Sequence, residues 1–128
     1  MDAGEIMTRG VITVKRDESV LAAMEKMVKR RVTSLIVEKT EKDKIYGIVT
    51  RRDVVNKVIA CGKDPAKLKV AEVMSEPLMT ISPEMGVEAI ARLMAKTNIR
   101  RFPVMDGDAF LGIVSNSDIL RAIALENM

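Results

Sequence analysis

Gly47-Ile48-Val49-Thr50-Arg51-Arg52-Asp53 has a near copy later in the chain, Gly112-Ile113-Val114-Ser115-Asn116-Ser117-Asp118. In both copies a short apolar run ends at a hydroxyl residue, and an acid follows three positions later. A hydroxyl residue three positions before an acid is typical of a helix N-terminus, and a short apolar run is typical of a buried strand. We therefore predict two buried strands, each leading directly into a helix.

The repetition extends over most of the 128 residues. Residues 5–37 align with residues 72–104 at a constant offset of 67, and eight of these 33 positions are identical, among them Thr13 and Thr80. Beyond a polar hairpin the offset falls to 65, which superposes the two quoted segments. Because hairpin loops tolerate changes in length, we predict a duplicated chain, with a first repeat at 1–61, a linker at 62–69 and a second repeat at 70–128.

The hydrophobic pattern follows the same order in both repeats. Short β-prone runs at 11–14 and 78–81 precede a helical stretch, two apolar strands (35–37 and 45–49, or 102–104 and 110–114) and a second helical stretch. The helix positions that we expect to be buried are Val20, Ala23, Met24, Met27, Val28, Val54, Val55, Val58 and Ile59, and Val87, Ile90, Ala91, Met94, Ala95, Ile119, Leu120, Ile123 and Ala124. Since so small a repeat buries little apolar surface, we predict an α/β protein in which two β-α-β-β-α repeats pack together.

The composition restricts the chemistry. The chain has no histidine, which excludes Ser-His and Cys-His nucleophiles and the HExxH metal helix, so we do not expect an enzyme. The single cysteine, Cys61, has no partner for an internal disulfide, which fits a reducing compartment. No apolar run is long enough to span a bilayer, and the first ten residues lack a signal-peptide apolar region. We expect a soluble, cytoplasmic protein with no membrane partner and no metal.

The charge balance is mildly basic, with 21 Lys and Arg against 18 Asp and Glu. Basic clusters at 29–31 and 51–52 are typical of a solvated face, and less often of a surface that binds nucleic acid. The chain has only three aromatic residues, which argues against stacking on single strands. Nucleic-acid binding therefore stays open as the less favoured alternative.

The quoted segments have two interpretations. In one, the hydroxyl and the acid form a capping box and nothing more, as in a ligand-free scaffold or interaction protein. In the other, the positive end of the helix binds a phosphate and the acid accepts hydrogen bonds from sugar hydroxyls, so that a nucleotide satisfies both. The glycine that opens each segment allows a neighbouring chain or a ligand to approach closely, or allows a strand bend. Acids folded onto their own main chain, with the grooves filled by side chains, would overturn the nucleotide-binding interpretation.

The order of elements, the duplication and the two Gly-x-x-Thr/Ser-x-x-Asp segments resemble a tandem pair of cystathionine beta-synthase (CBS) domains, often called a Bateman module. The resemblance covers nearly the whole chain. It implies a pseudo-twofold arrangement with two clefts that hold AMP, ADP, ATP or S-adenosylmethionine as regulatory ligand. It also implies energy or metabolite sensing, a homodimer, and a separate effector protein as the regulated target.

The same resemblance assigns residues to the ligand. Asp53 and Asp118 would bind ribose hydroxyls, and Thr50 and Ser115 would bind phosphate. The other ligand-binding residues that it implies are Arg52, Arg100 and Arg101 near the phosphates, Ile12, Met79 and Pro103 near the adenine, and the repeated Thr13 and Thr80. The first repeat has Thr33, Ser34 and Ile36 where the second has Arg100, Arg101 and Pro103, so we expect the two clefts to bind unequally.

Overall fold

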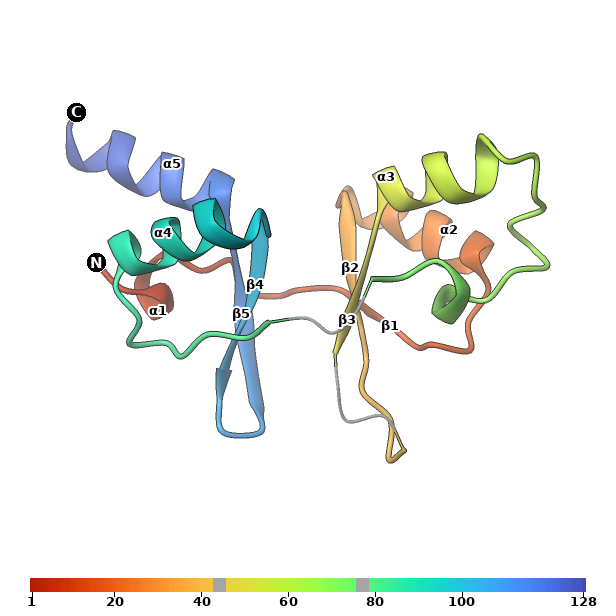
Figure 1. The fold of residues 1–128 in the computed structure, drawn as a ribbon, viewed down its shortest axis with the longest axis horizontal. Coiled ribbons are helices and arrows are strands. Elements are labelled where there is room, and N and C mark those ends of the chain that lie inside the picture. Colours follow the sequence, from red (N-terminus) through yellow and green to blue (C-terminus); the bar gives the residue numbers. More distant parts are fainter. Residues whose placement is uncertain (43–45, 76–78) are drawn as a thin grey trace. The chain divides into compact units, whose positions relative to one another are not determined.

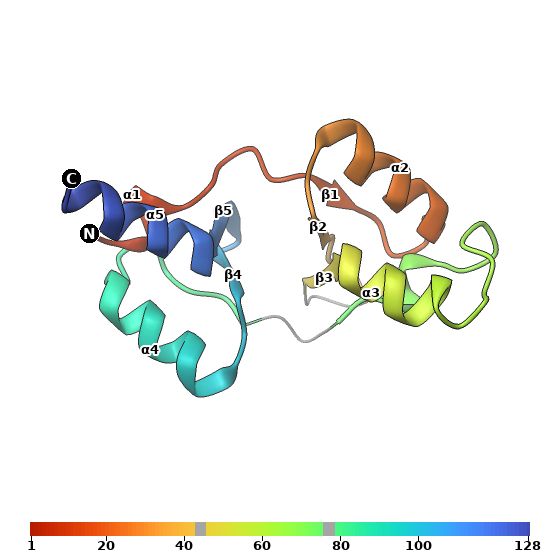
Figure 2. The same cartoon turned by 90° about the horizontal axis from the view of Figure 1, so that it is seen from above.

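The computed structural model describes residues 1–42, 46–75 and 79–128, and it divides into two compact units. Unit 1 consists of Met1–Val11 and Met79–Met128, and unit 2 of Ile12–Leu78. Figures 1 and 2 show that each unit combines helices with a small sheet. The α/β class predicted from the sequence is therefore confirmed.

Unit 2 contains a three-stranded sheet. Strand β1 (Thr13–Val14) runs parallel to β2 (Ser34–Val37), and β2 is antiparallel to β3 (Gly47–Thr50). Helix α2 (Val20–Arg30) connects β1 to β2. It begins at Ser19, whose side chain accepts a hydrogen bond from the Ala22 N–H, and it ends at a left-handed residue. After β3 the chain continues as α3 (Arg51–Val54), the π-helix η1 (Val55–Ile59) and later the 3-10 helix η2 (Val70–Glu72).

Unit 1 contains the antiparallel pair β4 (Arg101–Asp106) and β5 (Ala109–Ser115), with an irregularity between Val104 and Met105. Its helices are α1 (Ala3–Ile6), α4 (Val87–Thr97) and α5 (Asn116–Glu126). In the part that the structure describes, the strand predicted at 78–81 is reduced to one parallel bridge, between Ile81 and Val104. Residue 78 of this predicted strand, and residue 45 of the strand predicted at 45–49, lie outside the described residues.

Several helix positions predicted to be buried are exposed. Val20, Ala23 and Met27 of α2 are buried as expected, but the side chain of Val28 is 78% exposed. Each helix packs on its own sheet with one face only, so the apolar stripe is wider than the surface that covers it. The other positions that the prediction placed wrongly in the core are Val55, Ile59, Ala91, Ala95, Leu120, Ile123 and Ala124.

The segment that opens each repeat is packed in the unit formed mainly by the other repeat. Thr8 donates its backbone N–H to the carbonyl of Ile113 at 2.8 Å and accepts from the Ile113 N–H at 3.0 Å. Ser75 exchanges the same two hydrogen bonds with Ile48, at 2.9 and 3.1 Å. The units are divided after residues 11 and 78, which are equivalent at the offset of 67. The boundaries predicted at 61 and 70 follow the sequence repeat instead, and they stay a prediction.

This exchange explains the glycine in each quoted segment. A Cβ atom on Gly112 would lie 2.6 Å from the carbonyl oxygen of Thr8, which is closer than such atoms approach. A Cβ atom on Gly47 would lie 3.2 Å from the carbonyl oxygen of Ser75 and 3.1 Å from the sulfur of Met74. Of the explanations left open by the sequence, close approach of a neighbouring chain segment therefore holds at both positions.

No helix of the described residues is both long and apolar enough to cross a membrane. The core of unit 2 lies between its sheet and α2, and includes Val14, Leu35 and Val49. The core of unit 1 is built around Phe102, with Ile90 and Val114. Both cores include residues of the opening segments. Ala3 and Met7 belong to the core of unit 1, and Val70 and Val73 belong to the core of unit 2.

We predict that Gly112→Ala lowers the free energy of unfolding by about 2 to 3 kcal/mol, because a backbone oxygen must move to make room. Gly47→Ala is the matched variant and should cost about 1 kcal/mol, since its nearest neighbour is the flexible end of a methionine. Urea denaturation followed by circular dichroism measures both changes. Equal losses, or a neutral Gly112→Ala variant, would contradict this account of the two glycines.

Candidate functional site

Both capping boxes predicted from the sequence are formed. At the start of α3, the Thr50 N–H donates to Asp53 Oδ2 at 2.9 Å, and the Asp53 N–H donates to Thr50 Oγ1 at 3.1 Å. At the start of α5, the Ser115 N–H donates to Asp118 Oδ2 at 2.8 Å, and the Asp118 N–H donates to Ser115 Oγ at 3.3 Å. Each acid is thus folded onto its own main chain through one oxygen. What the second oxygen of each carboxylate contacts decides what else these residues can do.

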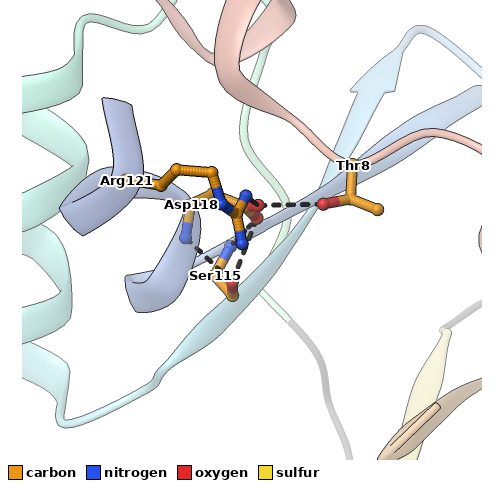
Figure 3. Close-up of polar contacts among 4 residues, drawn as sticks. All are labelled: Thr8, Ser115, Asp118 and Arg121. Carbon is orange, nitrogen blue, oxygen red and sulfur yellow. Dashed lines mark hydrogen bonds and ion pairs between the residues drawn. The ribbon is translucent and has the colours of Figure 1, made fainter. Parts of the chain in front are cut away.

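The second oxygen of Asp118 is fully engaged, as Figure 3 shows. Thr8 donates its hydroxyl to Asp118 Oδ1 at 2.9 Å, and Arg121 donates Nη1 to the same oxygen at 3.2 Å. The Asp118 side chain is 3% exposed, and among the described residues Asp118 is the only polar or charged one that is buried. A buried carboxylate needs such partners because its desolvation is costly. Asp118 therefore joins the opening segment of the chain to the start of α5.

The second oxygen of Asp53 is more accessible. It pairs with Lys57 Nζ at 3.2 Å, and the same ammonium group donates to the carbonyl of Val73 at 3.0 Å. The Asp53 side chain is 16% exposed and that of Lys57 is 48% exposed. Asp53 is thus connected to the opening segment of the second repeat through a lysine, whereas Asp118 contacts the opening segment of the first repeat directly.

The structure brings the predicted phosphate-binding residues of unit 1 together. Arg101 pairs with Ser115 in the β4–β5 ladder, and the Asn116 N–H donates to the carbonyl of Arg100 at 3.1 Å. Arg100 is exposed and Arg101 is half-buried, beside the first turn of α5. This turn carries the positive end of the helix dipole. The N-terminus of α5 and the backbone of the two arginines therefore lie next to one another.

Unit 2 has the same backbone arrangement with other side chains. Ser34 pairs with Thr50, and the Arg51 N–H donates to the carbonyl of Thr33 at 2.9 Å. The arginines of unit 1 are thus replaced by hydroxyl residues at the same two places. Arg52 is exposed on α3, one residue before Asp53. The positive charge next to the hydroxyl residue consequently comes from the strand start in unit 1 and from the helix in unit 2.

The residues predicted to contact adenine are placed less evenly. Ile12 and Thr13 lie beside β2, since the Ile12 carbonyl accepts from the Ile36 N–H at 3.1 Å and Thr13 pairs with Ile36. Pro103 is buried within β4, and its carbonyl accepts from the Ile81 N–H at 3.0 Å. Met79 and Thr80, just before Ile81, are exposed and belong to no strand. The ligand roles of all these residues stay predictions.

The sequence analysis missed three residues at the two acids, namely Thr8, Lys57 and Arg121. A signal existed for the two basic residues, because a cation three or four positions after an acid on a helix faces it. Thr8 lies 110 residues from Asp118 along the chain. The sequence signal that could have pointed to it is its alignment with Ser75, which is also a hydroxyl residue. Among the described residues, no group of three His, Cys, Asp or Glu residues is placed to hold a metal ion.

The comparisons with known proteins agree with the repeat. The family model of the CBS domain matches residues 3–60 and 70–125. An uncharacterised Methanopyrus kandleri protein, MK0525, is 35% identical over 94% of this chain, and the chain spans 62% of that relative's length. The hexameric CBS-CP12 protein from bloom-forming cyanobacteria is 43% identical, with a TM-score of 0.90 over 100% of this chain and 75% of its own. The structure of CBSX2 in complex with AMP is 24% identical, with a TM-score of 0.80 over 99% of both chains, a likeness of fold.

We predict that Asp118→Ala destabilises the protein more than Asp53→Ala, by about 2 to 4 kcal/mol against about 1 kcal/mol. Removing the Asp118 carboxylate leaves donors from Ser115 and Thr8 without their acceptor in a buried place. The Asp53 carboxylate is more exposed, so water can replace part of what it loses. Urea denaturation of the two variants measures the difference. A smaller loss for Asp118→Ala than for Asp53→Ala would show that burial does not set the cost.

Proposed function

This chain belongs to the CBS-domain family, and we propose that it is a regulatory module that binds AMP, ADP, ATP or S-adenosylmethionine. One observation carries the proposal. Each unit places a hydroxyl residue and an acid at a helix N-terminus, and in unit 1 the starts of α5 and of β4 bring Arg100 and Arg101 to the same place. A sugar phosphate needs this combination, because its phosphate is anionic and its hydroxyls are donors. The complex of CBSX2 with AMP supports the choice of ligand, since the folds are alike.

The proposed roles follow from position. Ser115, Arg100 and Arg101 bind phosphate oxygens in unit 1, where Asp118 binds the ribose. Thr50, Arg52 and Asp53 have the corresponding roles in unit 2. The residues that we assign to the nucleoside are Ile12, Thr13, Met79, Thr80 and Pro103. Because two guanidinium groups bind a multiply charged phosphate better than two hydroxyls do, unit 1 favours ATP over AMP more strongly than unit 2.

The module acts by binding and catalyses no reaction in this proposal. A ligand changes the output only if it binds one conformation or assembly better than another. The regulated target is a separate protein or a further part of a longer chain, since the chain spans 62% of MK0525.

We also propose that two copies associate through helix faces in a homodimer. A groove of about 410 Å³ lies between α2 and α3 and is lined by Met24, Val28, Val32, Val54 and Val55, among others. Two of these apolar side chains, Val28 and Val55, are exposed, as is Leu120 on α5. Exposed apolar surface of this kind marks interaction sites. Sedimentation velocity on the purified chain tests the proposal, and a monomer at high micromolar concentration would reject it.

We predict that at least one of the four adenosine compounds raises the melting temperature by several degrees at about 100 times its Kd, which corresponds to about 2.7 kcal/mol. Arg100→Gln should reduce the shift caused by ATP more than that caused by AMP. Arg92→Gln is the matched control, because Arg92 is an exposed arginine on α4 that pairs with Glu88. Differential scanning fluorimetry measures all of these shifts. If none of the four compounds changes the melting temperature, the chain is a ligand-free interaction module.

A further inference from the structure

We propose that the hydrogen bond from Thr8 to Asp118 is a latch that a bound nucleotide must open. This inference rests on the proposed function, because it concerns the acid assigned to the ribose of unit 1. The latch connects occupancy of that site to the segment of chain that leads into unit 2. It has no direct counterpart at Asp53, so the two sites differ in their coupling to the rest of the chain.

The first step of the argument is the saturation of the Asp118 carboxylate. A carboxylate accepts about four hydrogen bonds, two on each oxygen. Oδ2 accepts from the N–H and the hydroxyl of Ser115, at 2.8 and 3.0 Å. Oδ1 accepts from Thr8 and Arg121, as Figure 3 shows. A ribose hydroxyl therefore cannot bind to Asp118 without displacing one of these donors.

The second step identifies the donor that leaves Oδ1. Arg121 is paired with a carboxylate that is almost fully buried, so its displacement would cost an ion pair as well as a hydrogen bond. Thr8 supplies a neutral hydroxyl, and a ribose hydroxyl replaces it with a group of the same kind. On Oδ2 both donors belong to the capping box, because the Ser115 hydroxyl also accepts from the Asp118 N–H. Exchange at Thr8 thus costs least.

Asp53 lacks such a donor. Among the described residues the contact given for its Oδ1 is the ion pair with Lys57. Ser75, the residue equivalent to Thr8, bonds to Ile48 through its backbone. One position on Oδ1 of Asp53 is thus open to a ribose hydroxyl. Occupation of unit 2 therefore needs no exchange of this kind, and the latch belongs to unit 1.

The third step follows the chain from Thr8. Its backbone is paired with Ile113, and its carbonyl oxygen lies against Gly112. Three residues later the chain leaves unit 1, and at Thr13 it forms β1 of unit 2. When the Thr8 side chain is released from Asp118, one of the contacts that hold this segment on β5 is lost. Nucleotide binding in unit 1 should consequently weaken the backbone pairing between Thr8 and Ile113.

The experiment compares Thr8→Val with the wild type in a titration with AMP, or with ATP if only ATP raises the melting temperature. Amide chemical shifts of residues 115–118 report unit 1, and those of residues 50–53 report unit 2. We expect Thr8→Val to lower the Kd of unit 1 by roughly three- to ten-fold, the equivalent of one hydrogen bond. Thr8→Ser keeps the hydroxyl and should bind as the wild type does. Ser75→Ala, the matched variant in the other repeat, should leave the Kd of unit 2 unchanged.

Amide hydrogen exchange of the wild type supplies a readout that needs no variant. We expect the nucleotide to accelerate exchange at the amides of Thr8 and Ile113 while it protects those of residues 115–118. If the nucleotide binds but neither the Kd of Thr8→Val nor this exchange changes, the latch is wrong and the proposed function stands. If no adenosine compound binds to the wild type, the proposed function fails and the latch fails with it.

Discussion

The close contact between an opening segment and the glycine of the neighbouring strand is the constraint on which this structure depends. At Gly112 the carbonyl of Thr8 fills the place where a Cβ atom would otherwise stand, and at Gly47 the carbonyl of Ser75 lies less closely, 3.2 Å from that place. The backbone hydrogen bonds next to these contacts give β3 and β5 a partner on the edge that the hairpin leaves unpaired. The strand must therefore have a residue without a Cβ atom at one position, and a helix must begin directly after the strand. The order glycine, apolar pair, hydroxyl and acid follows from these two requirements.

The acid of each segment, Asp53 or Asp118, has a structural role in addition to the ligand role that we propose for it. It closes the capping box, and in unit 1 it also binds Thr8, so a single buried carboxylate joins the opening segment to the start of α5. A buried carboxylate is stable only while all its hydrogen-bond donors are in place, so a donor that leaves must be replaced by another. A ligand with suitable hydroxyls can supply that replacement. The structural and functional interpretations of the segment are thus compatible, and the same atoms can carry both.

The parts of the structure that depend on local chemistry could be predicted from the sequence. The capping boxes at Thr50 and Ser115 and the burial of Val20 and Met27 follow from spacing along one helix, which the sequence displays directly. The strand at 78–81 could not be settled in this way, because pairing depends on a partner elsewhere in the chain. The exposure of Val28 and Leu120 depends on how much of each helix its sheet covers. At the site, the approach of Arg100 and Arg101 to Ser115 was foreseen, whereas Thr8 was not, because no local pattern connects it to Asp118.

The reciprocal placement of the opening segments makes each repeat depend on the other for a complete sheet edge. A single repeat on its own would leave its first residues without this strand partner and the edge of its last strand uncovered. Two such repeats complete one another by trading those residues, as in a domain-swapped pair. Within one polypeptide the same exchange does not depend on protein concentration. The two repeats make this exchange differently, with a direct hydroxyl contact to the acid in unit 1 and a lysine-mediated contact in unit 2.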